Sequence, residues 1–345
     1  MLTVYSLEQS EQWDKIVKSF SEYDTYWLSG YVKAFQIHGD GEPLLFFVEN
    51  DDTRGINVVM KRDIATDERF SNKLSSNTLF DFSTPYGYGG WLIEGKNQDK
   101  ILDEYFQWCY ENNVISEFVR FHPLIKNHVY CNDEYEVVPL GEVVAMDLQS
   151  TDLIWENITS KNRNVIRKAI KNGVKIYNGR YPEIYRKFRS IYNGTMEKDN
   201  ADSYYYFDSN FYESILDDLP DEAQIFYAQI PDGTVIAASI MLASNGWMNY
   251  HLSGSLREYS SLAATNLLLY KAALWGSANG CKNLYLGGGV GSGEDSLFKF
   301  KRAFYKGELN RFYIGKKIFN KEKYNKLVSM RDDLGENTFF PRYRG

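Results

Sequence analysis

One lysine stands among phenylalanines in the segment SLFKFKRAFYKGE, residues 296–308, which has the periodicity of a helix. At about 100° per residue, Lys301 falls on the apolar face of that helix. The same face carries Leu297, Phe300 and Phe304. An ammonium group in apolar surroundings loses hydration, so its pKa shifts and it can stabilise negative charge that develops on an oxygen. Lys301 is therefore the candidate catalytic residue, with Phe300 and Phe304 as candidate ligand contacts.

Two acidic residues just before this helix offer another explanation for the lysine. Glu294 or Asp295 could form an ion pair with Lys301, or the lysine chain could extend to solvent at the rim of the core. In either case Lys301 would have a structural role. The base that removes a proton from an attacking amine stays open, because these two carboxylates and water are all available.

The five glycines of LGGGVGSGEDS, residues 286–296, do not fit a nucleotide-binding loop. A dinucleotide fingerprint needs a glycine three residues after its second glycine, where Glu294 or Ser292 stands here. A P-loop needs a lysine after Gly293, where Glu-Asp-Ser follows. Two carboxylates at the start of a helix also repel phosphate. Phosphate binding by this loop is therefore disfavoured.

The end of the preceding apolar strand, HLSGS at residues 251–255, offers backbone N–H groups for an anion. We expect this strand to lead directly into a long helix whose start contains Ala263 and Ala264, and such a junction binds anions well. An ordinary turn and helix cap is the structural alternative. The candidate ligand contacts on this strand are Tyr250, Ser253, Gly254 and Ser255.

Two further segments carry side chains suited to ligands. In TPYGYGG, glycines allow tight turns while Tyr86 and Tyr88 present rings that could stack on a ligand. In the basic segment SKNRNVIRKAIKNG, Arg163 and Arg167 could meet the phosphates of tRNA or of a nucleotide sugar. A structural turn and a solvated charged helix are the respective alternatives.

Other kinds of catalysis have little support. The four histidines are scattered, and neither a GxSxG elbow nor a Cys-His signature occurs, which disfavours a covalent enzyme intermediate. The three cysteines, Cys109, Cys131 and Cys281, lie far apart and indicate neither a disulfide framework nor a metal site. Acyl transfer to an amine needs only that the amine lie within attack distance of the carbonyl carbon, and that a positive or hydrogen-bonding group lie where negative charge develops on the oxygen.

Composition is that of an ordinary globular protein of 345 residues, 43% hydrophobic and 25% charged, long enough for two domains. The net charge of -7 disfavours broad binding to nucleic acid but leaves room for a local basic groove for RNA. The first residues do not form a basic start followed by an apolar run, and nowhere do about 18 apolar residues run together. We therefore expect a cytoplasmic protein without a transmembrane segment.

The amino-terminal half alternates helices and strands, which predicts a mixed α/β domain. Helices are predicted over residues 11–20 and after Lys96, and strands over residues 44–49, 56–62, 117–122 and 143–148.

From residue 151 the order begins again with helices over 152–158 and 161–173, a short strand over 174–177 and a helix over 181–196. Three apolar strands follow, separated by Pro-Asp-Gly and Asn-Gly turns, and predict an antiparallel meander. A long helix over 262–279 precedes a strand over 283–288, and a strand over 309–315 and a charged helix follow the Lys301 helix. This order is typical of a small acyltransferase domain.

Four segments in this order resemble the Fem-type aminoacyl transferases, whose members build peptidoglycan cross-bridges. They are the STPYGYGGW loop, the SKNRNVIRKAIKNGV helix, NLYLGG, and SLFKFKRAFYKGELNRFYIG. The family's Phe-Lys pair before another Phe is similar to Phe300, Lys301 and Phe304. The resemblance implies an α/β (α+β) fold of two tandem GNAT acyltransferase domains, each a mixed, largely antiparallel sheet flanked by helices.

The resemblance also implies how the domains divide. Residues 1–150 with 316–345 would form the first domain, and residues 151–315 the second, with the transfer channel around Lys301. The chain resembles the compact members of the family, because no long heptad-patterned arm occurs. Compact members hold a nucleotide-linked murein precursor with a lysine in the first domain and an arginine in the second. Here the corresponding segments are LSGYVKAFQ, with Lys33, and DSYYYFDSNF, which contains no arginine, so the acceptor stays open.

The predicted function is transfer of an aminoacyl group from aminoacyl-tRNA to an amine of a cell-envelope or glycan precursor, with no tightly bound cofactor and no metal. A second hypothesis takes acyl-CoA as donor and a sugar amine or amino acid derivative as acceptor. A third is an inactive protein that binds glycan precursors. The oligomeric state stays open.

Overall fold

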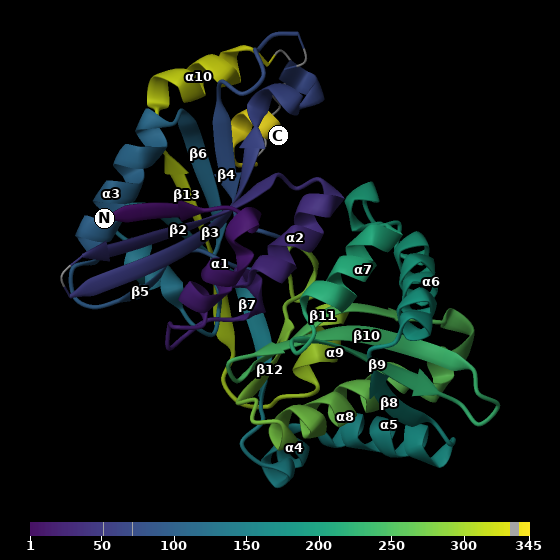
Figure 1. Ribbon diagram of the computed structural model, residues 1–345. Helices are drawn as coiled ribbons and strands as arrows, with labels where there is room; N and C mark the ends of the chain where they lie inside the picture. Colours follow the sequence, from purple (N-terminus) through teal and green to yellow (C-terminus); the bar gives the residue numbers. More distant parts are fainter. Residues whose placement is uncertain (51, 71, 332–337) are drawn as a thin grey trace. The chain divides into compact units, whose positions relative to one another are not determined.

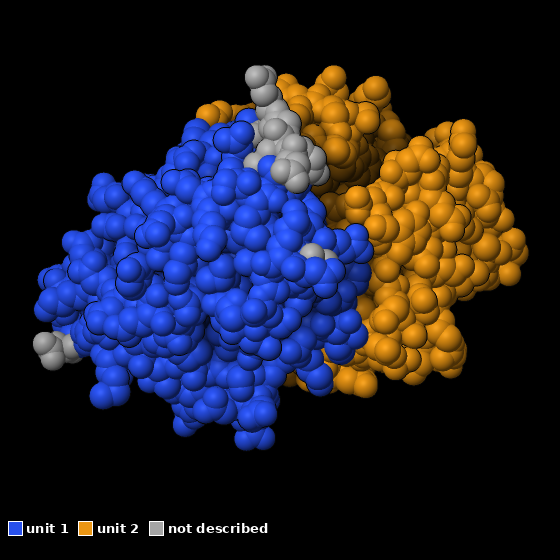
Figure 2. Space-filling model, turned by 90° about the horizontal axis from the view of Figure 1, so that it is seen from above, with its two compact units in different colours: residues 1–140, 312–345 blue, residues 141–311 orange. Residues whose placement is uncertain are grey.

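The computed structural model in Figure 1 describes residues 1–50, 52–70, 72–331 and 338–345. The chain divides into two compact units, which Figure 2 colours separately. Unit 1 comprises Met1–Leu140 and Phe312–Gly345, and unit 2 comprises Gly141–Arg311. The domain boundaries expected from the sequence lie at residues 150 and 316, close to this division, and the extent of each domain stays a prediction.

Unit 1 contains a mixed sheet whose strands follow the order β1-β2-β3-β4-β6-β13-β7, with β5 paired to β3. Strand β3 is antiparallel to β2, β4 and β5, β1 is antiparallel to β2, and β13 is antiparallel to β6, whereas β4 and β6 are parallel. The strands are β1 (Leu2–Tyr5), β2 (Glu42–Asn50), β3 (Thr53–Asp63), β4 (Phe80–Ser83), β5 (Leu92–Glu94), β6 (Val114–Arg120), β7 (Glu136–Asp147) and β13 (Asn310–Ile318).

The described part of unit 1 contains four α-helices: α1 (Ser10–Val17), α2 (Ser29–His38), α3 (Gln98–Glu111) and α10 (Lys321–Ser329). Helix α3 packs against one face of the sheet, where Phe46, Phe82 and Tyr105 form part of an apolar core. Helices α1 and α2 lie over the opposite face in Figure 1.

The last described residues close a second core of unit 1. Tyr343 has no exposed surface. Its hydroxyl donates to the carboxylate of Asp81 at 2.9 Å and lies 2.9 Å from the hydroxyl of Ser116. The Nε of Arg344 donates to the same Asp81 oxygen at 2.6 Å. These contacts tie the chain end to two interior strands, β4 and β6.

Unit 2 contains a sheet in the order β7-β12-β11-β10-β9-β8. Its further strands are β8 (Lys175–Gly179), β9 (Ala223–Gln229), β10 (Val235–Ser244), β11 (Trp247–Ser255) and β12 (Asn283–Gly287). Strands β9, β10 and β11 form the expected antiparallel meander. Strand β12 then adds to β11 in parallel, so the connection between them must cross over the sheet, and a helix provides it.

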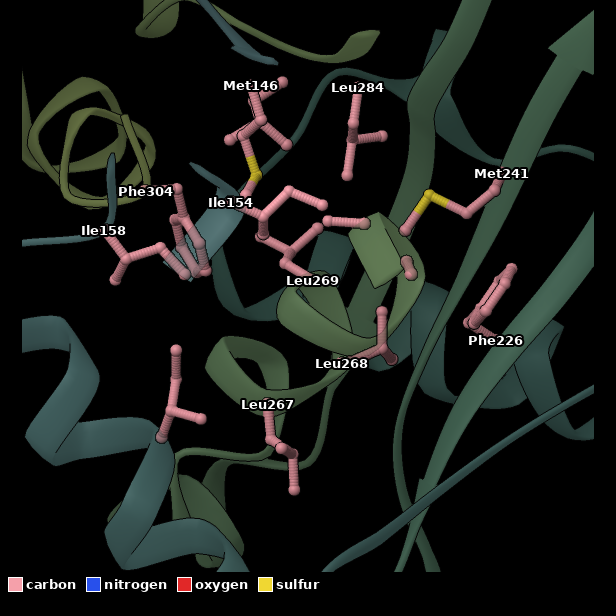
Figure 3. Close-up of a cluster of buried hydrophobic side chains, with 14 of the residues drawn as sticks. Met146, Ile154, Ile158, Phe226, Met241, Leu267, Leu268, Leu269, Leu284 and Phe304 are labelled. Carbon is pink, nitrogen blue, oxygen red and sulfur yellow. The ribbon is translucent and has the colours of Figure 1, made fainter. Parts of the chain in front are cut away.

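Six α-helices belong to unit 2: α4 (Thr151–Asn157), α5 (Ser160–Lys171), α6 (Pro182–Lys198), α7 (Ser209–Asp218), α8 (Ala264–Ala278) and α9 (Ser296–Arg302). Figure 1 shows α6 and α7 on one face of the sheet and α5 and α8 on the other. Under α8 lies a large apolar core, drawn in Figure 3, where leucines of the helix meet Met146, Met241, Leu284 and Phe304. Each fully buried leucine stabilises the fold by about 1.5–3 kcal/mol.

Local signals explain where the helices of unit 2 begin and end. The hydroxyls of Ser150 and Thr159 accept from the backbone N–H groups of Leu153 and Asn162, and so cap α4 and α5. Gly173 ends α5 two residues after its last turn, with a positive φ of 77° that glycine adopts without strain. The helices α2 and α7 and the short strands β1, β4 and β5 were not expected from the sequence. The other α-helices and strands named above were expected.

Candidate active site

Lys301 lies on α9 with only 9% of its surface exposed. Its ammonium group donates a hydrogen bond to the carbonyl oxygen of Gly288, just beyond β12, at 2.7 Å. Within the described part of the chain, no carboxylate lies in ion-pair distance of this nitrogen. An ammonium group has three N–H bonds, so two remain available to a ligand.

Burial sets the protonation behaviour of Lys301. Desolvation lowers the pKa of its ammonium group from 10.5 to about 8, and the charge of Asp295 opposes this shift. At neutral pH the group is therefore mostly a cation, but one that loses its proton slightly above neutrality. A lysine with these properties suits a site where charge develops during a reaction.

The ion pair considered as an alternative for Lys301 is not formed by Asp295, because that carboxylate caps α9. Its Oδ1 accepts from the N–H of Phe298 at 2.8 Å, and its Oδ2 accepts from the N–H of Val290 at 3.2 Å. These backbone hydrogen bonds lower the pKa of Asp295. Asp295 thus fixes the start of the helix that carries Lys301.

The apolar face of α9 differs by one position from the sequence-based expectation. Leu297, expected on that face, is 38% exposed, whereas Phe298 is 6% exposed. Phe298, Lys301 and Phe304 follow one another at intervals of three residues and are all buried. The prediction of Lys301 on the buried face is confirmed, and that of Leu297 is wrong because the helix turns Phe298 rather than Leu297 toward the core.

Two polar residues near the start of α5 hold the far end of α9. The N–H of Thr159 donates to the carbonyl oxygen of Ala303 at 3.0 Å, and the amide of Asn162 donates to the same oxygen at 3.4 Å. Asn266 on α8 donates to the Asn162 side chain at 2.8 Å. These positioning residues escaped the sequence analysis, because only the fold brings segments this far apart in the chain together.

A glycine keeps the space beside the ammonium group open. Gly287 has a positive φ of 83°, and a β-carbon at this position would lie 3.2 Å from the Nζ of Lys301. A larger residue would be strained and would press on the amine. The glycine stretch therefore shapes the surroundings of Lys301, rather than forming a phosphate loop.

Lys301 lies where two parallel strands separate. Strands β11 and β12 pair only from Trp247 to Asn249 with Asn283 to Tyr285, although both continue beyond these residues. Backbone groups on the diverging parts no longer bond to each other, and such gaps admit ligands. Gly288, which holds Lys301, follows directly after the end of β12, which no longer pairs with β11 but still pairs with β7.

The expected anion site at the end of β11 has a different structure. A 3-10 helix, Arg257–Leu262, stands between this strand and α8, so the strand does not lead directly into the long helix. The N–H of Ser255 donates to the hydroxyl of Thr195 at 3.0 Å, and the hydroxyl of Ser239 donates to that of Ser253 at 2.8 Å. These groups are engaged inside unit 2, because α6 packs on this end of the strand.

Gly254 makes that packing possible. A β-carbon at Gly254 would lie 2.8 Å from the Cα of Tyr192 on α6. We expect Gly254→Ala to lower the free energy of unfolding by about 1–3 kcal/mol, because the helix backbone must move outward. Chemical denaturation followed by circular dichroism measures this loss. Gly194→Ala on α6, where a β-carbon would meet no atom within 4 Å and the glycine has no positive φ, is the control without a steric clash.

The aromatic candidates of unit 2 all border its apolar core. Phe304 has no exposed surface, while Phe300 and Tyr250 are half-buried and pack against the same core. The rings of Phe300 and Phe304 meet edge to face with centroids 5.4 Å apart. Burial raises the pKa of the Tyr250 phenol, and hydrogen bonds with Ser253 and Ser239 oppose the shift. A ligand can reach Phe300 and Tyr250, whereas Phe304 supports them from the interior.

The arginine candidates lie on α5 around a tryptophan. The guanidinium carbons of Arg163 and Arg167 lie 6.0 and 5.1 Å from the ring centre of Trp155. Arg163 also donates to the Trp155 carbonyl at 3.3 Å, and Arg167 donates to the Asn164 side chain at 2.9 Å. Arg167 is the more exposed of the two and is the better placed to meet a phosphate.

Tyr86 and Tyr88 belong to unit 1, where both are half-buried in an aromatic cluster. The Tyr86 ring stacks on Phe35 at 5.6 Å, and the Tyr88 ring meets that of Tyr26 at 5.5 Å and that of His122 at 5.6 Å. Beneath them His122 bonds to Asp24 at 3.0 Å, and both are buried. The loop has a structural role here, and its rings keep some exposed surface for a ligand.

The described residues contain neither a metal-binding cluster nor a membrane-spanning helix. No group of three or more histidine, cysteine, aspartate or glutamate side chains is arranged to hold a metal ion there. None of the helices in the described ranges has the length and apolar character needed to span a bilayer.

Residues 160–302, which include Lys301, match the acetyltransferase (GNAT) domain family. No curated protein matches the sequence of the chain.

Solved structures resemble almost the whole chain. FemX superposes with a TM-score of 0.69 at 12% identity, covering 94% of this chain and 99% of FemX. L-PGS from Bacillus licheniformis gives 0.59 at 13% identity, covering 93% and 96%. A conserved protein of unknown function from Bacteroides thetaiotaomicron VPI-5482 gives 0.59 at 10% identity, covering 92% and 100%. At such identities the similarity concerns the fold alone.

The predicted fold class is confirmed. The chain has a mixed α/β fold with sheets flanked by helices, it superposes on FemX over almost its whole length, and residues 160–302 match the GNAT domain family. The matched acetyltransferase domain supports an enzyme of the transferase class. GNAT acyltransferases use acyl-CoA as a co-substrate, which is one of the two donors expected from the sequence.

Proposed function

We propose that the chain transfers an aminoacyl group from aminoacyl-tRNA to an amine of a cell-envelope or glycan precursor, with Lys301 as the catalytic residue. The observation that carries the proposal is the buried ammonium group of Lys301, which donates one hydrogen bond to Gly288 and has two further N–H bonds available to a ligand. Gly287 leaves room beside it for a carbonyl oxygen. The resemblance to Fem-type transferases in the segments around Lys301 supports the same role.

In this mechanism the acceptor nitrogen attacks the ester carbonyl carbon of the donor. A C–N bond forms, negative charge develops on the carbonyl oxygen, and the ammonium group of Lys301 donates a hydrogen bond to it. The carbonyl double bond then re-forms from the oxyanion as the bond between the carbonyl carbon and the ribose oxygen breaks. The proton lost by the amine balances the one that the ribose oxygen gains, either directly or through water.

A basic face on α5 supports a tRNA donor. This helix carries five basic residues and no acidic residue, and Lys161, Arg167, Lys168 and Lys171 are exposed. Exposed cations without acidic neighbours on their helix attract the phosphates of RNA, and the attraction weakens with added salt. Arg167 beside the Trp155 ring adds a planar group that can contact phosphate or a base.

Acyl-CoA is the second candidate donor, because residues 160–302 match an acetyltransferase domain. The reaction differs only in the bond that breaks, a thioester C–S bond. The first N–H groups of α8 have no acceptor within the helix, and they could bind the pyrophosphate of coenzyme A.

Binding of coenzyme A distinguishes the two donors. A ligand at 100 times its dissociation constant stabilises a protein by about 2.7 kcal/mol, which a thermal shift detects and calorimetry then quantifies. Under our proposal, coenzyme A and acetyl-CoA bind weakly or not at all, and a transfer assay with charged tRNA gives product. Tight binding of acetyl-CoA, together with acetylation of an amine, would replace tRNA by acyl-CoA as donor.

The pKa of Lys301 predicts a pH dependence of the rate. As the pH rises through about 8 the group loses its proton, so the stabilisation of the oxyanion decreases. We expect the ratio of wild-type rate to Lys301→Met rate to fall over this range, and this ratio cancels the titration of the acceptor amine. A ratio that rises with pH would show that Lys301 acts as a base instead.

A further inference from the structure

A pocket of 180 Å³ lies between helices α6 and α7 of unit 2. Helix α6 contributes residues at positions 182, 185, 186 and 189, and α7 contributes positions 209, 212, 213 and 216. Both sets follow the spacing of one helix face, so the two helices turn these faces toward each other. Packed helix pairs normally fill such a seam with side chains. The space left here is larger than a packing defect, since a cavity of about 150 Å³ accepts a benzene molecule.

The floor of the pocket is aromatic. Tyr185 and Tyr212 are 4% and 3% exposed. The hydroxyls of Tyr185 and Tyr212 are both buried, and neither has a hydrogen-bond partner among the residues that the structure describes. A buried hydroxyl without a partner is costly, so a group that accepts a hydrogen bond from it would be bound favourably.

The same pocket carries positive charge. Arg189 lines the pocket, is half-buried, and forms neither an ion pair nor a hydrogen bond within the described ranges. Burial raises the pKa of Tyr212, and the positive charge of Arg189, which lines the same pocket, opposes that shift. The second arginine of the pocket, Arg186, is exposed and pairs with Glu183 at 3.0 Å. Arg189 is thus the cation left for an anionic ligand.

We propose that this pocket binds a small monocarboxylic acid with an apolar body. The carboxylate would accept from the Tyr212 hydroxyl and from Arg189, with the Tyr185 hydroxyl as a further donor, and the apolar body would lie against the Tyr185 ring and Leu216. The exposed carboxylate of Glu213 at the mouth disfavours a second negative charge on the ligand. The volume suits one aromatic ring or a branched chain of similar size.

The site is independent of the proposed transferase activity. It is lined by the amino-terminal half of α6, whereas the helix backbone that faces Gly254 at the end of β11 is that of Ile191 and Tyr192, further along α6. Binding can therefore be measured whether or not the chain transfers acyl groups.

The test uses the full chain and benzoate as the probe, with benzamide as the neutral isostere. We expect calorimetry or ligand-observed NMR to give saturable binding of benzoate near about 1 mM and weaker binding of benzamide. Tyr212→Phe and Arg189→Gln should each weaken benzoate binding by about tenfold, since each removes a hydrogen bond to a charged group. Tyr177→Phe, which removes an exposed hydroxyl on β8, is the matched control and should change nothing.

Two outcomes would overturn the proposal. One is the absence of saturable benzoate binding in a wild-type chain that is folded by circular dichroism. The other is binding that benzamide equals or that neither Tyr212→Phe nor Arg189→Gln weakens, because the pocket would then not recognise the carboxylate. Phthalate, which carries a second carboxylate, should bind less tightly than benzoate because of Glu213.

Discussion

Lys301→Met is expected to lower the rate of acyl transfer at least about 100-fold while the protein remains folded and still binds its substrates. The substitution keeps an unbranched side chain of similar length but removes the ammonium group. Removing a single donor to a developing oxyanion has effects of this size because the group acts mainly in the transition state. Steady-state kinetics should therefore show the loss in kcat rather than in KM.

The stability of this variant should change little. Replacing Lys301 by Met removes the free-energy cost of burying a cation, which stabilises the protein. It also removes the hydrogen bond to Gly288, which destabilises it. These contributions oppose each other, so the free energy of unfolding should stay within about 1 kcal/mol of wild type.

Lys299→Met is the matched control, because Lys299 is exposed on the same helix. It should retain the wild-type rate. A wild-type protein that binds a glycan precursor but shows no transfer with charged tRNA or acyl-CoA would support the inactive-binder hypothesis. Full activity of Lys301→Met would contradict the catalytic role proposed for the lysine.

Tyr343→Ala is expected to destabilise unit 1 by about 3–5 kcal/mol, the usual cost of replacing a large buried aromatic side chain by alanine. Tyr343 has no exposed surface and packs against Phe70 and Tyr324. Its hydroxyl is also a partner of Asp81, which is fully buried. Urea denaturation monitored by tryptophan fluorescence measures the loss.

Tyr343→Phe separates packing from hydrogen bonding in the same position. Asp81 keeps Arg344 and Arg62 as partners in this variant, so the loss should be only about 1–2 kcal/mol. Equal losses in the two variants would mean that the hydroxyl, and not the ring, dominates. A Tyr343→Ala protein as stable as wild type would show that the end of the chain contributes little to unit 1.

Sequence reasoning located most of the second unit because its signals are local. Gly173 and the capping side chains of Ser150 and Thr159 mark helix ends in the sequence itself. The meander of β9, β10 and β11 follows from apolar runs between turn residues. The helix α7 was missed because its aromatic residues resemble those of a strand or loop, and packing against α6 decides its conformation.

The surroundings of Lys301 show where local reasoning ends. The periodicity placed the lysine on a buried face, but the register of a seven-residue helix depends on what packs against it, so Phe298 took the position expected for Leu297. The anchors of α9 at Thr159 and Asn162 are more than a hundred positions away in the chain. No sequence window contains both ends of such a contact.

The position of β13 has a consequence for synthesis on the ribosome. Strand β13 pairs with β6 in the interior of the unit 1 sheet, yet all of unit 2 separates it from β6 in the chain. While unit 2 is translated, β6 therefore presents an unpaired edge, and unpaired edges favour aggregation. Unit 2 is contiguous and can complete its own sheet first. Unit 1 can become native only after residue 318 has left the exit tunnel, so the earlier part of the chain finishes folding last.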